Sequence, residues 1–294
     1  MMAYFIVFCA SALNGICNVL GECYNRRVKK TDSFCYTAII SLIVFLFYFI
    51  YGGFSVDCDT LSAITACGYG ACYCLTFVFM LRALKYGQVS LVSLVMAYSL
   101  MLPTFFGIFF YGDYPGLTFY VGLALLVFAV FLIGKKDSKP KGEEKREKSD
   151  GKWLIFSVLA MTTNGALSVL QTYQQKTTEG NYRSGFMMIA MAIVFLFSTV
   201  MVIVDAKKDK EVIAFNFQKG WWVASIYGIA NALLNLAVMT VVNLLPAGPV
   251  FSTICGVSLV ITLVLSVTLF KERLNVAQTV GFFVGLCSTV LMNL

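Results

Sequence analysis

Residues 135–151 read KKDSKPKGEEKREKSDG, a charged run that divides an otherwise apolar chain. The run contains Pro140 and Gly142 and shows no apolar periodicity, so it has little surface to bury and predicts a solvated linker. About ten apolar runs of roughly 18 to 24 residues lie on its two sides, and a single helix of that length spans a bilayer. We therefore predict two five-helix repeats, residues 1–134 and 152–294, joined by this linker.

The composition indicates an integral membrane protein. Hydrophobic residues make up 59% of the chain and charged residues 13%, with a mean hydropathy of +0.82. A soluble protein could not carry runs such as 34–51 or 257–269 without aggregating. The first apolar run lacks a basic start and a small-residue cleavage site, so we expect a retained helix and not a signal peptide. The predicted fold class is all-α, with ten transmembrane helices.

The expected helices follow the apolar runs. Residues 33–51 contain few polar side chains and predict a lipid-facing wall, Pro103 predicts a kink in its helix, and the polar segment 205–211 predicts a loop insertion. The predicted helices are 3–24, 33–51, 61–82, 88–111, 116–134, 152–173, 184–204, 221–243, 249–270 and 276–294.

The two halves resemble each other residue by residue. A shift of 150 lays Asn14-Gly15 on Asn164-Gly165, and a shift of 159 lays Asp113 on Glu272 and Gly122 on Gly281. Because each half has an odd number of helices, the second half enters the membrane in the opposite orientation. Inverted repeats of this kind are typical of alternating-access transporters, with the substrate held near the midplane.

Polar positions recur on one face of the first helix of each half. In the first half they fall at spacings of 0, 4, 7 and 11, the spacing of one helical face: Asn14, Asn18, Gly21 and Asn25. Their counterparts in the second half are Asn164, Ser168, Gln171 and Gln175. An unpaired amide in hydrocarbon is costly, so both faces should point into the bundle or a wet cavity.

Three further stretches carry a family resemblance: Ala83-Leu-Lys-Tyr-Gly87, Phe270-Lys-Glu-Arg-Leu274 and Gln278-Thr-Val-Gly281. Together with the two five-helix halves, they resemble the EamA-type members of the drug/metabolite transporter superfamily. The resemblance implies a carrier whose cavity is lined by the first, third and fourth helices and their repeat mates.

The chain also departs from related sequences. Gly112-Asp113 stands where the family usually has a Glu-Arg ending. Four-helix relatives carry a proton-coupling glutamate at the place that Asn14 occupies here, and a neutral amide exchanges no proton near neutral pH. Glu22 is the remaining candidate for coupling.

The predicted function is secondary transport of a small polar or amphipathic metabolite or drug. Amide and hydroxyl groups suit such a substrate, and an interhelical hydrogen bond is the alternative role for each of them. The candidate substrate-binding residues are Asn14, Asn18, Tyr69, Tyr73, Tyr98, Asn164, Ser168, Gln171, Asn231 and Asn235. A flippase for a lipid-linked headgroup and a non-transporting membrane sensor or scaffold are the alternative functions.

No catalytic residue, metal site or cofactor is predicted. Histidine is absent, none of the ten cysteines forms a CxxC motif, and most cysteines lie inside apolar runs, where a thiol usually acts as a packing residue. The expected partners are the lipid bilayer and a small-molecule substrate, with no nucleic acid, and the sequence is consistent with a monomer.

Basic residues predict the orientation of the chain. Almost all lysines and arginines fall in the loops after the odd-numbered helices, while the other loops offer only Lys176 and Arg183. The positive-inside rule then places both termini outside and the linker in the cytoplasm of a multi-pass cell-membrane protein. The family resemblance implies the opposite orientation, and our prediction follows the charge.

Overall fold

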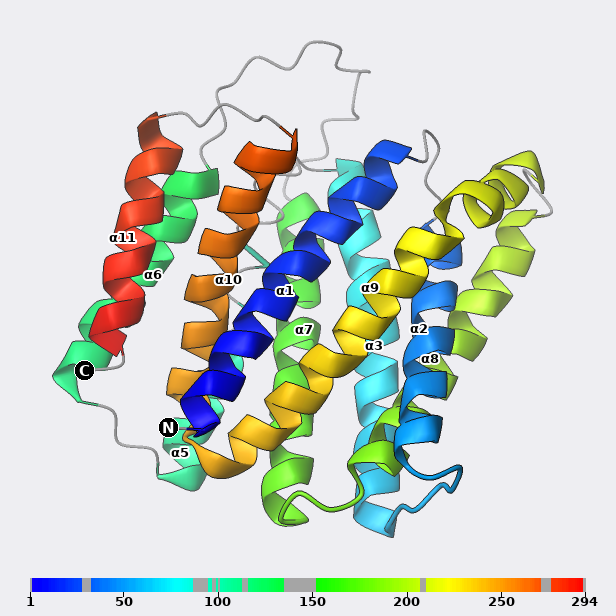
Figure 1. Ribbon diagram of the computed structural model, residues 1–294, viewed down its shortest axis with the longest axis horizontal. Coiled ribbons are helices and arrows are strands. Elements are labelled where there is room, and N and C mark those ends of the chain that lie inside the picture. Colours follow the sequence, from blue (N-terminus) through cyan, green and yellow to red (C-terminus); the bar gives the residue numbers. More distant parts are fainter. Residues whose placement is uncertain are drawn as a thin grey trace. The chain divides into compact units, whose positions relative to one another are not determined.

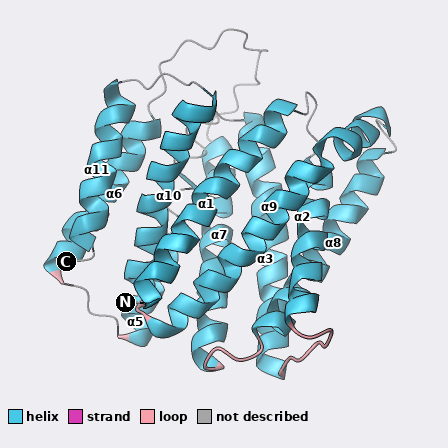
Figure 2. Ribbon diagram, viewed as in Figure 1, coloured by secondary structure: helices cyan, strands magenta, loops and turns pink. Residues whose placement is uncertain are grey.

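The computed structural model describes residues 2–27, 33–86, 95–96, 99, 101–112, 116–134, 152–206, 210–270 and 276–292. Helices and loops account for all of these residues, with no strand among them (Figure 2). A bilayer offers no water to backbone groups, and a helix satisfies those groups within its own segment. Six of the described helices are long and apolar enough to cross a membrane, and the protein is a multi-pass membrane protein.

The chain forms two compact units, and each unit draws on both halves of the sequence. Unit 1 comprises residues 1–74 and 170–244, and unit 2 comprises residues 75–169 and 245–294. Helices α3 (Thr60–Tyr86) and α7 (Lys152–Thr177) each contribute one end to either unit. The compact units are therefore distinct from the two sequence repeats.

Unit 1 contains four further helices: α1 (Met2–Arg27), α2 (Ser33–Tyr51), α8 (Arg183–Ala206) and α9 (Lys210–Leu244) (Figure 1). Helix α9 packs along α1 and α2, and α2 also packs along α8. The α2 face toward these partners is buried, with Val44 and Tyr48 fully enclosed. The sequence predicted only a lipid-facing wall here, because the aromatic and aliphatic residues of α2 look alike on both faces.

Unit 2 contains α5 (Met101–Tyr111), α6 (Leu117–Gly134), α10 (Ala247–Phe270) and α11 (Val276–Met292). Its packing includes α6 against α11 and α10 against both α5 and α11. Phe119 and Leu126 of α6 form a buried cluster with Leu123 and Cys255.

Several of these contacts join helices at corresponding positions of the two halves. Helix α2 packs on α8, α5 packs on α10, and α6 packs on α11. The shifts of 150 and 159 that align the sequence halves pair these same helices. The two-repeat architecture is thus visible in the packing inside each unit.

The insertion predicted at residues 205–211 is helical at both of its ends, and residues 207–209 lie outside the described residues. Helix α8 continues to Ala206 and α9 begins at Lys210, where the sequence analysis started the helix at Trp221. Lysine, glutamate and alanine are good helix formers, so a charged stretch without proline or glycine extends a helix into water. Helix α9 has 35 residues against 27 in its counterpart α3, so the extra residues lengthen a helix.

The structure does not test the predicted kink at Pro103. Pro103 lies in α5, whose described part begins at Met101, and residue 100 just before it lies outside the described residues. Much of the predicted helix 88–111 before Met101 lies outside the described residues.

Candidate functional site

The predicted site residues fall into both units. Unit 1 holds Asn14, Asn18, Tyr69, Tyr73, Gln171, Asn231 and Asn235, and unit 2 holds Asn164 and Ser168. Tyr98 and the side chain of Glu22 lie outside the described residues. Each unit is therefore considered by itself.

Three predicted residues form a continuous amide chain inside unit 1. Gln171 Nε2 of α7 donates to Asn235 Oδ1 of α9 at 3.3 Å. Asn235 Nδ2 donates to Asn231 Oδ1 at 3.0 Å and to the Asn231 carbonyl at 2.9 Å. Gln171 is buried, and Asn231 and Asn235 are half-buried. These three amide side chains place hydrogen-bond donors and acceptors along two apolar helices.

The tyrosines of α3 lie in the same unit. Tyr69 is buried, with the edge of its ring against Phe186 at a centroid distance of 5.5 Å. Tyr73 is half-buried and near enough to Tyr36 and Tyr227 to interact electrostatically with both.

In unit 2, the polar face of α7 contacts neighbouring segments. Asn164 Nδ2 donates to Ser99 Oγ at 2.8 Å, and Thr76 Oγ1 donates to Thr163 Oγ1 at 2.8 Å. A Cβ on Gly165 would lie 2.7 Å from the Ser99 carbonyl, so only glycine allows this approach. Asn164 thus makes a hydrogen bond within the protein, of the kind that the sequence analysis kept open as an alternative to substrate binding.

A second polar network lies at the end of α7, and the sequence analysis missed most of it. Gln174 and Gln175 are fully buried, and Gln175 Nε2 donates to Gln174 Oε1. Gln174 Nε2 also donates to Ser62 Oγ at 2.7 Å and to the Asn181 carbonyl at 3.2 Å. We call Ser62, Gln174, Gln175, Arg183 and Thr240 the glutamine network.

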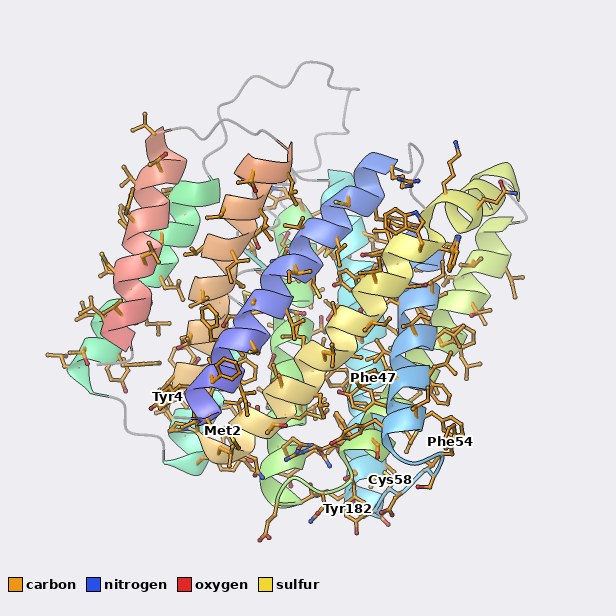
Figure 3. The ribbon with its side chains drawn as sticks, viewed as in Figure 1. Met2, Tyr4, Phe47, Phe54, Cys58 and Tyr182 are labelled. Atoms are coloured by element: carbon orange, nitrogen blue, oxygen red, sulfur yellow. The ribbon has the colours of Figure 1, made fainter. Side chains whose placement is uncertain are left out.

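Arg183 is the charged member of the glutamine network. Its Nε donates to Gln175 Oε1 at 2.9 Å, and its Nη1 donates to Thr240 Oγ1 at 3.3 Å. Thr240 Oγ1 in turn donates to the Leu236 carbonyl at 2.8 Å. The network therefore ties together the ends of four helices, α3, α7, α8 and α9. The labelled Cys58 and Tyr182 mark this end of unit 1 in Figure 3.

Asp59 connects the glutamine network to the loop before α3. Its Oδ1 accepts a hydrogen bond from the Ser62 backbone N–H at 3.0 Å, which caps the helix. A hydrogen bond from the Ser62 side chain is the main reason that the pKa of the Asp59 carboxyl is lowered from its usual value.

The other end of unit 1 holds three packed tyrosines, Tyr24 of α1, Tyr36 of α2 and Tyr227 of α9, which we call the tyrosine cluster. The Tyr24 and Tyr36 ring centroids are 4.2 Å apart, and those of Tyr36 and Tyr227 are 5.5 Å apart. Beside the cluster, Arg27 lies over the Trp222 ring at 5.0 Å and donates through Nε to the Lys219 carbonyl. The sequence analysis selected none of these tyrosines.

One sequence signal points to the glutamine network. Gln174 and Gln175 are adjacent amides at the end of an apolar run, and Gln175 already belonged to the predicted polar face. No periodicity selects Arg183, because its partners Gln175 and Thr240 lie on two other helices.

Known proteins were compared with the whole chain. A model of the EamA-like transporter family matches residues 1–135 and 151–294. Among curated proteins, none matches this sequence. One similar solved structure, described only as "Crystal structure of protein", has a TM-score of 0.71 and 14% identity, covering 99% of this chain and 96% of that one. At that identity the likeness shows a shared fold and says nothing of the substrate.

Proposed function

The chain belongs to the EamA-like transporter family, and we propose that it is a secondary carrier that moves a small polar or amphipathic metabolite by alternating access. The observation that carries the proposal is the amide chain Gln171–Asn235–Asn231, which lies along two apolar membrane helices. Amides at such positions need partners, and the partners can be other helices or a polar substrate.

The substrate class follows from the chemistry of these groups. Each amide offers both donors and acceptors, which suits zwitterions, nucleosides, sugars and other uncharged polar molecules. We propose that the predicted set binds the substrate: Asn14, Asn18, Tyr69, Tyr73, Tyr98, Asn164, Ser168, Gln171, Asn231 and Asn235. The carrier is proposed to work as a monomer without a cofactor.

A screen followed by an exchange assay tests the proposed function. A metabolite that binds the folded protein raises its melting temperature by mass action, so a thermal-shift screen identifies candidates. The strongest candidate is then tested in proteoliposomes, where unlabelled compound outside should accelerate efflux of labelled compound from inside. A channel shows flux without this acceleration, and a scaffold or sensor shows no flux, so either result would contradict a carrier.

The role of Asn14 can be tested with Asn164 as its repeat counterpart. If both amides bind the substrate, Asn14→Leu and Asn164→Leu should each weaken affinity by about one to two orders of magnitude, since a lost hydrogen bond to a buried group costs roughly 1 to 3 kcal/mol. Ser99→Ala removes the helix partner of Asn164 and serves as the control for lost packing. A fall in melting temperature with unchanged affinity would assign both amides to helix packing.

We propose that the protein resides in the cell membrane with both termini outside and residues 135–151 in the cytoplasm. The support is the excess of lysine and arginine in one set of loops. A C-terminal reporter active only in the cytoplasm should be silent when fused after Leu294. An active reporter would reverse the orientation.

A further inference from the structure

The Tyr36 hydroxyl is a buried polar group without a hydrogen-bond partner among the described residues. Folded proteins pair most such groups, because an unpaired buried hydroxyl gives up its hydrogen bonds to water. Tyr48 lies on the same helix, and its hydroxyl donates to the Ala232 carbonyl at 3.1 Å. Helix α2 thus carries two buried tyrosine hydroxyls, one with a partner at Tyr48 and one, at the half-buried Tyr36, without a partner among the described residues.

Gly21 of α1 lies beside the enclosed Tyr36 hydroxyl. A Cβ built on Gly21 would lie 3.9 Å from this oxygen, so the hydroxyl faces the position where Gly21 lacks a side chain. Gly21 belongs to the polar face of α1 that also contains Asn14 and Asn18. The hydroxyl therefore points at the helix face that the sequence analysis assigned to the substrate.

Two aromatic rings pack against the ring of Tyr36. The Tyr24 ring lies at 4.2 Å and the Tyr227 ring at 5.5 Å from the Tyr36 ring, centroid to centroid. Among the described residues, the groups that interact electrostatically with Tyr36 are Tyr227, Tyr73, Cys17 and Tyr24, none of which is charged near neutral pH. Among the described residues, the environment is aromatic, and the Tyr36 oxygen is a polar atom there without a hydrogen-bond partner.

An aromatic belt at the membrane surface would explain tyrosines near helix ends, but not this one. Belt tyrosines direct their hydroxyl groups toward water or lipid headgroups. The Tyr36 oxygen is enclosed within the protein. Ring packing alone would equally be served by phenylalanine, which carries no polar atom.

We propose that Tyr36 and Gly21 form a subsite in which the Tyr36 hydroxyl binds the hydroxyl, amide or amine of a small aromatic substrate, with the Tyr24 and Tyr227 rings against its apolar part. The inference rests on the proposed carrier function and narrows its substrate class. A polar group beside a ring matches both features of the subsite, since stacking and one hydrogen bond add specificity to apolar contact.

The first test compares the stability of two matched variants without ligand. Tyr48→Phe removes a hydrogen bond and should lower the melting temperature by about 2 °C or more. Tyr36→Phe removes an unpaired hydroxyl and should leave the melting temperature unchanged or raise it. An equal loss in both variants would show that Tyr36 has a partner inside the protein and would overturn the subsite.

The second test measures binding of two compounds to protein in nanodiscs. The compounds are benzyl alcohol and ethylbenzene, in which a methyl group replaces the hydroxyl. The wild type should prefer benzyl alcohol, and Tyr36→Phe should weaken benzyl alcohol binding by about 3- to 10-fold while leaving ethylbenzene unchanged. Tyr48→Phe should retain the wild-type preference, and lipid partitioning is the same in all three samples. Equal binding of both compounds to the wild type, or no effect of Tyr36→Phe, would contradict the proposal.

The two proposals fail in different ways. The carrier proposal fails if the reconstituted wild type shows no exchange of the compound found by screening. The subsite proposal fails if exchange occurs and Tyr36→Phe transports with wild-type affinity. In that second case Tyr36 packs beside the path without contacting its substrate.

Discussion

The two ends of unit 1 differ in whether their buried polar groups are hydrogen-bonded. At the glutamine network, amides, hydroxyls and one guanidinium are joined in a continuous series of hydrogen bonds from Asp59 to Thr240. At the tyrosine cluster, the Tyr36 hydroxyl is enclosed without a partner among the described residues. Helix α2 runs between the two ends and contributes Tyr48 near one and Tyr36 to the other.

Whether a buried polar group has a hydrogen-bond partner indicates whether it stabilises the fold or is free to bind a ligand. A satisfied polar network rigidifies the elements that it joins, and its members have little capacity left for a ligand. An unsatisfied group in an enclosed place lowers stability, and a substrate that pairs with it recovers that loss on binding. Polar character alone therefore does not distinguish binding residues from packing residues in this protein, and an unused hydrogen-bonding group is a second, independent indication of binding.

The largest expected effect comes from breaking the glutamine network. Gln175→Leu removes the acceptor of Arg183 Nε and the donor to Gln174. Stability should fall by about 2 to 4 kcal/mol, because a charged group and a buried amide each lose a partner. The matched control is Tyr173→Leu, an exposed position on the same helix, which should change stability by less than about 0.5 kcal/mol. Thermal unfolding of both variants checks this, and equal melting temperatures would mean that the network contributes no stability.

Each end of unit 1 has a tightly packed glycine whose replacement should have a smaller effect than Gln175→Leu. A Cβ on Gly185 would collide with the Asp57 carbonyl, and a Cβ on Gly220 would collide with the Tyr24 ring. Overpacking should make Gly185→Ala and Gly220→Ala less stable by about 1 to 3 kcal/mol.

Gly21 supplies the control for these two glycines. A Cβ there would meet the Tyr36 hydroxyl at an ordinary van der Waals distance of 3.9 Å, so Gly21→Ala should be stabilising by up to about 1 kcal/mol through helix propensity. Melting temperatures of the three alanine variants test the contrast. If Gly21→Ala is as destabilising as the other two, the Tyr36 hydroxyl has no space beside it.

The smallest effect concerns Asp59 and depends on pH. Its folded-state pKa is lowered, so its ionised form stabilises the protein above the unfolded-state pKa of about 3.9, and this contribution is lost as the pH falls through the folded-state value. Asp59→Asn should be slightly less stable than the wild type at pH 7, and the gap should close at lower pH. Melting curves between pH 7 and pH 3 measure it, and a gap that stays constant would contradict the linkage.

The fold could be predicted from the sequence to a large extent, because the length and hydropathy of apolar runs identify membrane helices. The predicted bounds of α2, 33–51, match the structure, whereas those of α9 missed its start. Charge was treated as a sign of a loop there, although charged residues are compatible with a helix that leaves the membrane.

The candidate site was harder to predict, for two physical reasons. The amide chain Gln171–Asn235–Asn231 could be anticipated because amides stand out in apolar helices. Arg183 could not, because its role depends on Gln175 and Thr240, which come from two other helices. Tyr36 could not either, since only the packed structure distinguishes a hydroxyl with a partner from one without.

The most direct test of the account places a hydrogen-bond partner beside Tyr36. Gly21→Ser brings a hydroxyl within reach of the Tyr36 oxygen, and Tyr36→Phe removes that oxygen, so the two changes form a double-mutant cycle. We predict that Gly21→Ser raises the melting temperature more in the Tyr36 background than in the Tyr36→Phe background, by a coupling of about 1 kcal/mol, and that it abolishes the preference for benzyl alcohol. The same change in melting temperature in both backgrounds, with the preference retained, would contradict an unused hydrogen-bonding group at Tyr36.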